Sequence, residues 1–368
     1  MASGKNHGRT LLIATLILSV LGIVAVADAS GPQALAYFGD SLYFVKQQLV
    51  WGGIGLVALL VGLIVDYSVW KKYASLIFLV NLILLVVVLI PGIGSKLLGA
   101  RRWISVGFVS IQPSELIKFS IIIYLAKVTE LKKPFINLVL PIGLVAFLVM
   151  LQPDLGTTII ILVTGFTQLF IAGVSILPFL ATGGIGGLIG FILVVTSSYR
   201  RQRLMTFLES SSDPLSTSYH IRQVLIALGS GGIFGVGLGQ GRQKYLFLPE
   251  SATDSVFANI AEELGFVGAV LLIFALSFFV YKIVRIAINA PDHFSTILCA
   301  GIVSWISAQI FLNLASMVAL VPLTGVPLPF FSYGGSSLVV ILFAVGVLLN
   351  VSKHSKVTEE VKHARKRR

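Results

Sequence analysis

Apolar residues run along this chain in long blocks that short polar connections separate. A helix needs about 20 apolar residues to cross the hydrocarbon core of a bilayer, and this length divides the chain into ten predicted spans. They cover residues 10–28, 47–65, 73–90, 111–128, 135–151, 157–173, 177–197, 256–280, 294–320 and 331–350. The pattern predicts an all-α integral membrane protein, a single polytopic domain over residues 1–368 with both termini on one side.

Composition supports this prediction. Hydrophobic residues make up 56% of the 368 residues and charged residues only 11%, and the mean hydropathy is +0.97. These values are typical of membrane proteins and exclude an ordinary soluble domain. The first apolar segment ends in AVADAS, which resembles a signal-peptidase site, but its core is long for a signal peptide, which favours an uncleaved span. The single cysteine, Cys299, excludes an intrachain disulfide.

The net charge of +12 raises the question of a polyanionic partner. The basic residues are scattered over short connections and a tail, so anionic lipid is the expected partner and nucleic acid is not. Sixteen Lys and Arg residues would share the side of the termini, and the positive-inside rule predicts that this side is cytoplasmic. Residues 351–368 would then form a basic cytoplasmic tail that contacts anionic headgroups.

The opposite side carries ten Lys and Arg residues, six of them in the connection 198–255. This segment is predicted to be a large extracytoplasmic loop between spans seven and eight. Long loops follow the charge rule poorly, but loops of more than about 15 residues are usually functional or disordered. Within it, IRQVLIAL has the periodicity of an amphipathic helix at the membrane interface. The glycines from Gly229 to Gly241 predict turns or, equally well, close backbone packing.

Two turns with a Gln-Pro-acid pattern lie at the ends of predicted spans. QPSELIK places Glu115 and Lys118 at positions i and i+3 of one helix face, where the two charges can neutralise each other. Because ionisable residues inside spans are costly and usually paired or functional, structural pairing and substrate contact both stay open. LQPDLGT places Asp154 at the outer end of the fifth and sixth spans.

Asp254 follows the basic loop and comes just before the apolar eighth span. Nearby cations would lower its pKa and desolvation would raise it, a balance that suits a general base. A helix cap formed by Thr253 or Asp254 is the favoured structural alternative. Glu262 lies more than two turns into the same span, so a catalytic role competes with a hydrogen bond to a neighbouring helix.

The last connection, VPLTGVPLPFFSYGGSS, leads into the tenth span. Ser332, Gly334 and Gly335 would place a hydroxyl and free N–H groups at a helix start, which attracts phosphate. Close helix packing through the glycines is the equal alternative. No zinc motif or P-loop is present and His220 is the only histidine expected on this side, so no metal site is predicted. A basic, lipid-facing cavity suits an anionic lipid headgroup, above all a pyrophosphate.

Six motifs in this order resemble the SEDS family (shape, elongation, division and sporulation), which includes the RodA and FtsW proteins. They are GARRWI (99–104), QPSELIK (112–118), LQPDLGT (151–157), GVGLGQGRQKYLFLPESATD (235–254), AEELGF (261–266) and TGVPLPFFSYGGSS (324–337). They span most of the chain. The RQKYLFLPE and VPLPFFSYGG segments look closer to the FtsW-like division branch than to the elongation branch. Ser255 departs from the family pattern, which commonly has Phe after the acid.

The resemblance implies a glycosyltransferase that polymerises lipid II into glycan strands at the outer face of the bacterial cytoplasmic membrane, inverting an undecaprenyl-pyrophosphate-linked donor. It also implies that the protein acts in division or elongation, together with a class B penicillin-binding transpeptidase and other divisome or elongasome membrane proteins. No cofactor is required by the sequence, although Mg²⁺ or Mn²⁺ could share the charge of the pyrophosphate.

Residue by residue, the resemblance assigns Asp254 as the catalytic base. It assigns the following positions to substrate binding: Arg102, Glu115, Lys118, Asp154, Gln243, Lys244, Glu250, Ser332, Gly334 and Gly335. Supporting positions are Glu262, Arg101 and Arg203. Two alternatives stay open, namely a flippase for lipid-linked saccharides and a scaffold that holds a partner's single span. A flippase predicts polar residues along both halves of a pathway.

Overall fold

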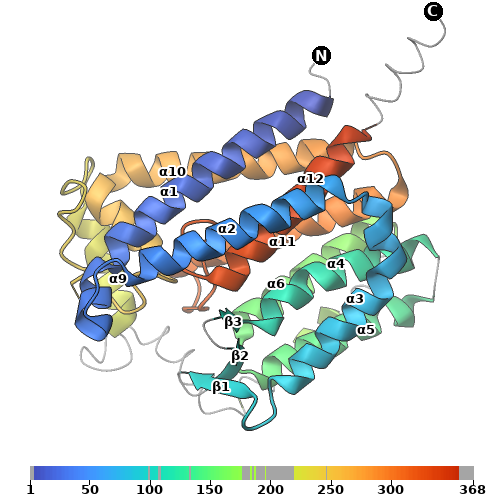
Figure 1. Cartoon of the computed structure of the whole chain (residues 1–368), viewed down its shortest axis with the longest axis horizontal. Helices are drawn as coiled ribbons and strands as arrows, with labels where there is room; N and C mark the ends of the chain where they lie inside the picture. Colours follow the sequence, from blue (N-terminus) through green and yellow to red (C-terminus); the bar gives the residue numbers. More distant parts are fainter. Residues whose placement is uncertain are drawn as a thin grey trace, which may run out of the picture.

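Long helices dominate the computed structural model (Figure 1), which describes residues 4–97, 100–106, 109–131, 134–175, 219–245 and 247–355 and the isolated residues 183, 184, 186, 187 and 195. The described helices are α1 (Gly4–Phe38), α2 (Tyr43–Ile64), α3 (Tyr67–Val87), α4 (Pro113–Glu130), α5 (Phe135–Leu151), α6 (Leu155–Ile171), α9 (Tyr219–Ser230), α10 (Val256–Ile288), α11 (His293–Met317) and α12 (Gly335–Lys353).

Nine of the ten predicted spans coincide with described helices, and the seventh, 177–197, lies almost entirely outside the described residues. Within the described part, six helices are long and apolar enough to cross a membrane: α1, α2, α3, α10, α11 and α12. Helices α5 and α6 are apolar but shorter. The mostly helical architecture is therefore confirmed, whereas the count of ten spans stays a prediction.

The expectation of an entirely helical chain needs one correction. Between α3 and α4 the chain forms a small antiparallel sheet in the order β1-β2-β3, with β1 at Gly94–Leu97, β2 at Ala100–Val106 and β3 at Val109–Ile111. These strands are three to seven residues long. Segments so short carry too few alternating positions for a period of two to stand out in the sequence.

Helices α11 and α12 form the centre of the described bundle. The most apolar stretch of α12 is 89% buried and that of α11 is 67% buried, against 28% or less for the other membrane-crossing helices. Helices α2 and α12 run side by side (Figure 1). A Cβ added to Gly346 would lie 2.2 Å from the backbone oxygen of Leu59, so a small residue is required at this crossing, as is common between membrane helices.

The two ends of the described bundle differ in character. The start of α1 meets the end of α12, because a Cβ on Gly8 would fall within 2.4 Å of Ser352 Oγ. The same end holds an ion pair between Lys71 and Glu130 at 2.6 Å. Both termini thus lie at the same end of the described bundle (Figure 1), as expected if they share one side of the membrane. That this side faces the cytoplasm stays a prediction. The small sheet lies at the other end (Figure 1).

Candidate active site

Helix α10 is interrupted at Gly265, where φ is +68° and ψ is −168°. At this break, the Gly-rich segment after α9 supplies hydrogen-bond donors to carbonyls of α10. Val236 N donates to the Glu262 carbonyl at 3.1 Å and Gly237 N to the Glu263 carbonyl at 3.0 Å. An added Cβ at Gly265 would lie 2.2 Å from Gly235 N. The glycines were predicted either to form turns or to allow close backbone packing, and both predictions are partly confirmed, because these glycines form turns and also lie against the backbone of α10.

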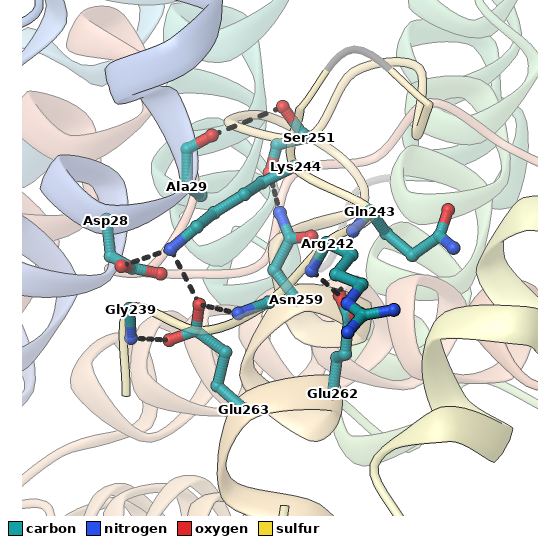
Figure 2. Close-up of polar contacts among 11 residues, drawn as sticks. Asp28, Ala29, Gly239, Arg242, Gln243, Lys244, Ser251, Asn259, Glu262 and Glu263 are labelled. Atoms are coloured by element: carbon teal, nitrogen blue, oxygen red, sulfur yellow. Dashed lines mark hydrogen bonds and ion pairs between the residues drawn. The ribbon is translucent and has the colours of Figure 1, made fainter. Parts of the chain in front are cut away.

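The side chains of Glu262 and Glu263 hold the next part of this segment (Figure 2). Glu262 accepts hydrogen bonds from the N–H groups of residues 242 and 243 at 2.9 and 3.2 Å. Glu263 accepts from residues 239 and 241 at 2.8 and 3.0 Å. Both carboxylates are buried. Glu262 therefore bonds to the Gly-rich connection and not to a neighbouring helix, as the structural alternative had expected, and its supporting role stays a prediction.

Lys244 lies between two carboxylates in Figure 2. Its Nζ is 2.6 Å from Asp28 Oδ1 on α1 and 2.7 Å from Glu263 Oε1 on α10, and the residue is only 4% exposed. Burial alone would lower the pKa of this ammonium, but the hydrogen bonds to Asp28 and Glu263 outweigh burial and hold the pKa above its ordinary value. The ion pairs thus fix the Gly-rich segment between α1 and α10.

The loop that carries Asp254 continues from this ionic contact. Ser251 Oγ donates to the Ala29 carbonyl at 3.3 Å, and Asn259 Nδ2 donates to the Ser251 carbonyl at 2.9 Å. Glu250 takes a left-handed conformation with φ of +52°. Its carboxylate accepts from Thr253 Oγ1 at 2.8 Å. Strained backbone of this type often marks a functional turn.

The cap predicted at Thr253 or Asp254 is not the one formed. The N-cap of α10 is Ser255, whose side chain makes no capping hydrogen bond. Ser255 Oγ lies 2.8 Å from His220 Nε2 of α9 instead. A serine at this position therefore joins α9 to the start of α10.

Helix α11 and the connection before α12 hold the Asp254 loop. Asn313 Nδ2 on α11 donates to the carbonyls of Asp254 at 2.9 Å and Val326 at 2.8 Å. Ser332 Oγ donates to the Thr253 carbonyl. The Asp254 side chain is half-buried, and a Cβ built on Gly325 would lie 3.4 Å from its Oδ2. The carboxylate therefore lies directly against the connection before α12.

The predicted pairing of Glu115 and Lys118 is present. Lys118 Nζ is 2.8 Å from Glu115 Oε1 and 3.1 Å from Gln309 Oε1, and all three residues are buried. Gln309 Nε2 in turn donates to the Pro327 carbonyl at 2.9 Å. The second carboxylate oxygen of Glu115 has no hydrogen-bond partner in the structure. This pair therefore reaches the Asp254 region through α11.

Arg102 and Asp154 meet at one turn. Arg102 donates from Nε to the Gln152 carbonyl at 2.9 Å and from NH2 to the Pro153 carbonyl. Asp154 caps α6 by accepting from Thr157 N at 3.0 Å and from Thr157 Oγ1 at 2.9 Å. Both residues shape the turn between α5 and α6 in this conformation.

Five predicted positions remain: Arg101, Arg203, Gln243, Gly334 and Gly335. Gln243 is held by its backbone on Glu262, and Arg101 follows in β2 directly before Arg102. A Cβ on Gly335 would lie 2.2 Å from the Trp51 ring, which supports its packing role, while Gly334 is the extended N-cap of α12 with φ of 179°. Arg203 lies outside the described residues. Substrate contact at Gln243, Gly334 and Gly335 stays a prediction, as do the supporting roles of Arg101 and Arg203.

Three polar residues of this region were not predicted: Asp28, Gln309 and Asn313. Each lies inside an apolar helix, where an isolated polar residue was the only available signal. Of the three, Asn313 contacts the backbone of the half-buried Asp254 directly, Gln309 bonds to the connection before α12, and Asp28 holds Lys244. A carboxylate in the setting of Asp254, held by hydrogen bonds to its own backbone, can accept a proton from a bound hydroxyl group.

The comparisons with known proteins concern nearly the whole chain. A family model described as cell cycle protein, which covers FtsW, RodA and SpoVE, matches residues 9–357. The chain belongs to this family. Stage V sporulation protein E of Bacillus subtilis is 44% identical over 94% of this chain and 97% of its own length. A probable peptidoglycan glycosyltransferase FtsW of Trichlorobacter lovleyi is 40% identical over 96% of this chain and 94% of its own.

Solved structures of the family share the fold. A chain from a study of polymerization and crosslinking by a peptidoglycan synthase complex matches with a TM-score of 0.76 and 27% identity, covering 94% of this chain and 98% of that chain. The rod shape determining protein RodA of Thermus thermophilus matches with a TM-score of 0.70 and 27% identity, covering 94% and 97%. The predicted resemblance to the SEDS family is confirmed, and the chain is a multi-pass membrane protein.

Proposed function

We propose that this protein is a peptidoglycan glycosyltransferase that polymerises lipid II at the outer face of the bacterial cytoplasmic membrane. The observation that carries the proposal is the setting of Asp254, which is half-buried, opposite the termini, and fixed by α11 through Asn313. Family membership over residues 9–357 supports the same activity. The names of the relatives, FtsW and SpoVE, favour a role in division or sporulation.

In the proposed reaction Asp254 takes the proton from the acceptor sugar hydroxyl as its oxygen attacks the anomeric carbon of the donor. The bond from that carbon to the lipid diphosphate breaks, and the configuration at the carbon inverts, as in inverting glycosidases. Developing negative charge on the diphosphate needs nearby cations. Arg102 is suited to this task, because its described partners are uncharged backbone carbonyls.

The described bundle also offers an apolar groove for an elongated lipid. The groove has a volume of about 640 Å³ and lies between α6, α10 and α11. It extends along α11 from Thr296 to Leu312, about 24 Å at 1.5 Å per residue. This length approaches the thickness of the hydrocarbon core. A prenyl chain in this groove would leave its diphosphate near the end of α11 that carries Asn313.

Two finer parts of the proposal concern partners and cations. A class B penicillin-binding transpeptidase would crosslink the strands, and the peptidoglycan synthase complex that resembles this chain supports such a partner. Among the described residues, no three His, Cys, Asp or Glu side chains are grouped to hold a metal ion. Mg²⁺ or Mn²⁺ bound to the phosphates of the substrate would supply further positive charge there.

The test uses purified protein in liposomes with labelled lipid II, with and without a transpeptidase partner. The variant Asp254→Asn keeps the size of the side chain and removes its basicity. We expect glycan strands from the wild type and none from the variant, while thermal unfolding shows both to be folded. Near-normal strand formation by a folded variant would remove Asp254 from the mechanism. A flippase would instead move lipid II across the bilayer without forming strands.

A further inference from the structure

The Gly-rich segment between α9 and Lys244 exposes several large apolar side chains. Ile233 is 64% exposed, Phe234 82% and Leu238 73%. Protein surfaces in water rarely gather such residues without a cover. None of the three takes part in the contacts that hold the Asp254 loop. Their exposure therefore needs a separate explanation.

This segment lies at the outer limit of the lipid-facing surface of α10. Phe266 N donates to the Gly232 carbonyl at 2.9 Å, and Phe266 and Phe274 are 68% and 70% exposed on the adjoining helix. From Phe266 to Arg285 the helix rises about 28 Å at 1.5 Å per residue. This nearly equals the hydrocarbon thickness of about 30 Å. If Arg285 lies at one boundary of the hydrocarbon core, the Gly-rich segment lies at the opposite boundary.

Non-helical backbone is tolerated at membrane depth only when its polar groups are satisfied by protein. Between residues 235 and 243, eight backbone N–H groups are hydrogen-bonded, and only that of Leu238 has no bond among the described contacts. Six of the eight acceptors belong to Glu262 and Glu263, through carbonyl or carboxylate oxygens. Within residues 233–238 themselves, the N–H groups of residues 235–237 and the carbonyls of Ile233 and Gly237 are hydrogen-bonded to protein. Protein contacts therefore satisfy part of this backbone, although it is neither helix nor strand.

We propose that residues 233–238 insert into the outer leaflet, and that their occupant is the acyl-chain region of bilayer lipid. The exposed side chains of this segment continue the lipid-facing surface of α10. Lys244 follows six residues after Leu238 and is fixed to Asp28 and Glu263. The depth of insertion consequently sets the height above the bilayer of the loop that carries Asp254.

The test is site-directed spin labelling of the full chain in lipid nanodiscs, in a Cys299→Ala background. Labels are placed by Phe234→Cys and Leu238→Cys. Phe274→Cys supplies the lipid control, and Ser105→Cys on the exposed face of the small sheet supplies the water control. Collision rates with oxygen, which concentrates in lipid, are compared with those of a neutral nickel chelate, which stays in water. We expect oxygen-to-nickel ratios at 234 and 238 several-fold above that at 105.

Two other results would overturn the proposal. A ratio at 234 and 238 equal to that at 105 places the segment in water, where a soluble partner domain would have to cover it. Low collision rates with both reagents place it against a second copy of the chain. The unmodified chain provides a further check by hydroxyl-radical footprinting in nanodiscs. Phe234 should be oxidised less than Phe38, although Phe234 is 82% exposed and Phe38 51%; greater oxidation of Phe234 would contradict insertion.

Discussion

Asn313 offers the sharpest test of how the protein holds Asp254. Its amide donates to two carbonyls, those of Asp254 and Val326, and its side chain is fully buried. The variant Asn313→Leu keeps the approximate volume and removes both donors. We expect the Asp254 loop to shift relative to the connection before α12, while the helix around residue 313 stays intact.

The magnitude follows from the contacts. Two carbonyls lose their donor, the buried one of Val326 and the part-buried one of Asp254, at a cost of up to about 1–3 kcal/mol each. The amide oxygen of Asn313 has no partner in the structure, so its removal returns about 1–3 kcal/mol. The net destabilisation is therefore about 1–3 kcal/mol, which is less than the usual stability of about 5–15 kcal/mol. The variant should stay folded, yet a 1 Å displacement of a catalytic group can lower the rate by about 10²-fold.

The assay measures strand formation from lipid II per folded molecule, with thermal unfolding of the same sample. Ser295→Ala is the matched control, because Ser295 is also buried on α11 but bonds to the Asp292 carbonyl, at 3.0 Å, at the other end of the helix. We expect the control to lose about 1 kcal/mol of stability and to keep its activity. If Asn313→Leu forms strands as fast as Ser295→Ala, the amide does not position Asp254 and the reasoning is wrong.

Two further predictions concern charges outside this contact. Lys244→Met leaves the buried Glu263 and the half-buried Asp28 without their cation, so thermal unfolding should show a loss of about 3–5 kcal/mol; an unchanged melting temperature would contradict the buried pair of Lys244 and Glu263. Burial raises the pKa of Asp292, but hydrogen bonds from the Ser295 N–H and the Tyr67 hydroxyl outweigh it and hold the pKa below its ordinary value. Stability from Asp292 is therefore present above about pH 3.9 and is lost as the pH falls through the lowered pKa. Wild type should lose more stability on this acidification than Asp292→Asn does, and equal losses would refute the linkage.

The sequence predicted those features that depend on neighbours along the chain. Apolar blocks of about 20 residues located nine described helices, because burial in lipid requires length and composition only. The spacing of Glu115 and Lys118 predicted their ion pair, because residues at i and i+3 share a helix face. The amphipathic helix at α9 was predicted from its periodicity for the same reason.

Features that depend on distant residues were not predictable in this way. Lys244 and Asp28 are 216 positions apart, and no local pattern joins them. Asn313 lies in an apolar helix, where its partners are carbonyls that carry no sequence signal. The break at Gly265 depends on close approach of Gly235 from another segment. A glycine in an apolar helix predicts close packing as readily as a break.

The contacts change the electrostatic hypothesis that the sequence suggested. The sequence suggested a basic cavity for a pyrophosphate, but Lys118 is neutralised by Glu115 and Lys244 lies between two carboxylates. A cation whose charge is cancelled within 3 Å produces little net field at a distant phosphate. Arg102 differs, because backbone carbonyls orient its guanidinium without cancelling its charge. We therefore propose that Arg102 supplies positive charge to the diphosphate, and that the two lysines act on Asp254 through the segments that they hold in place.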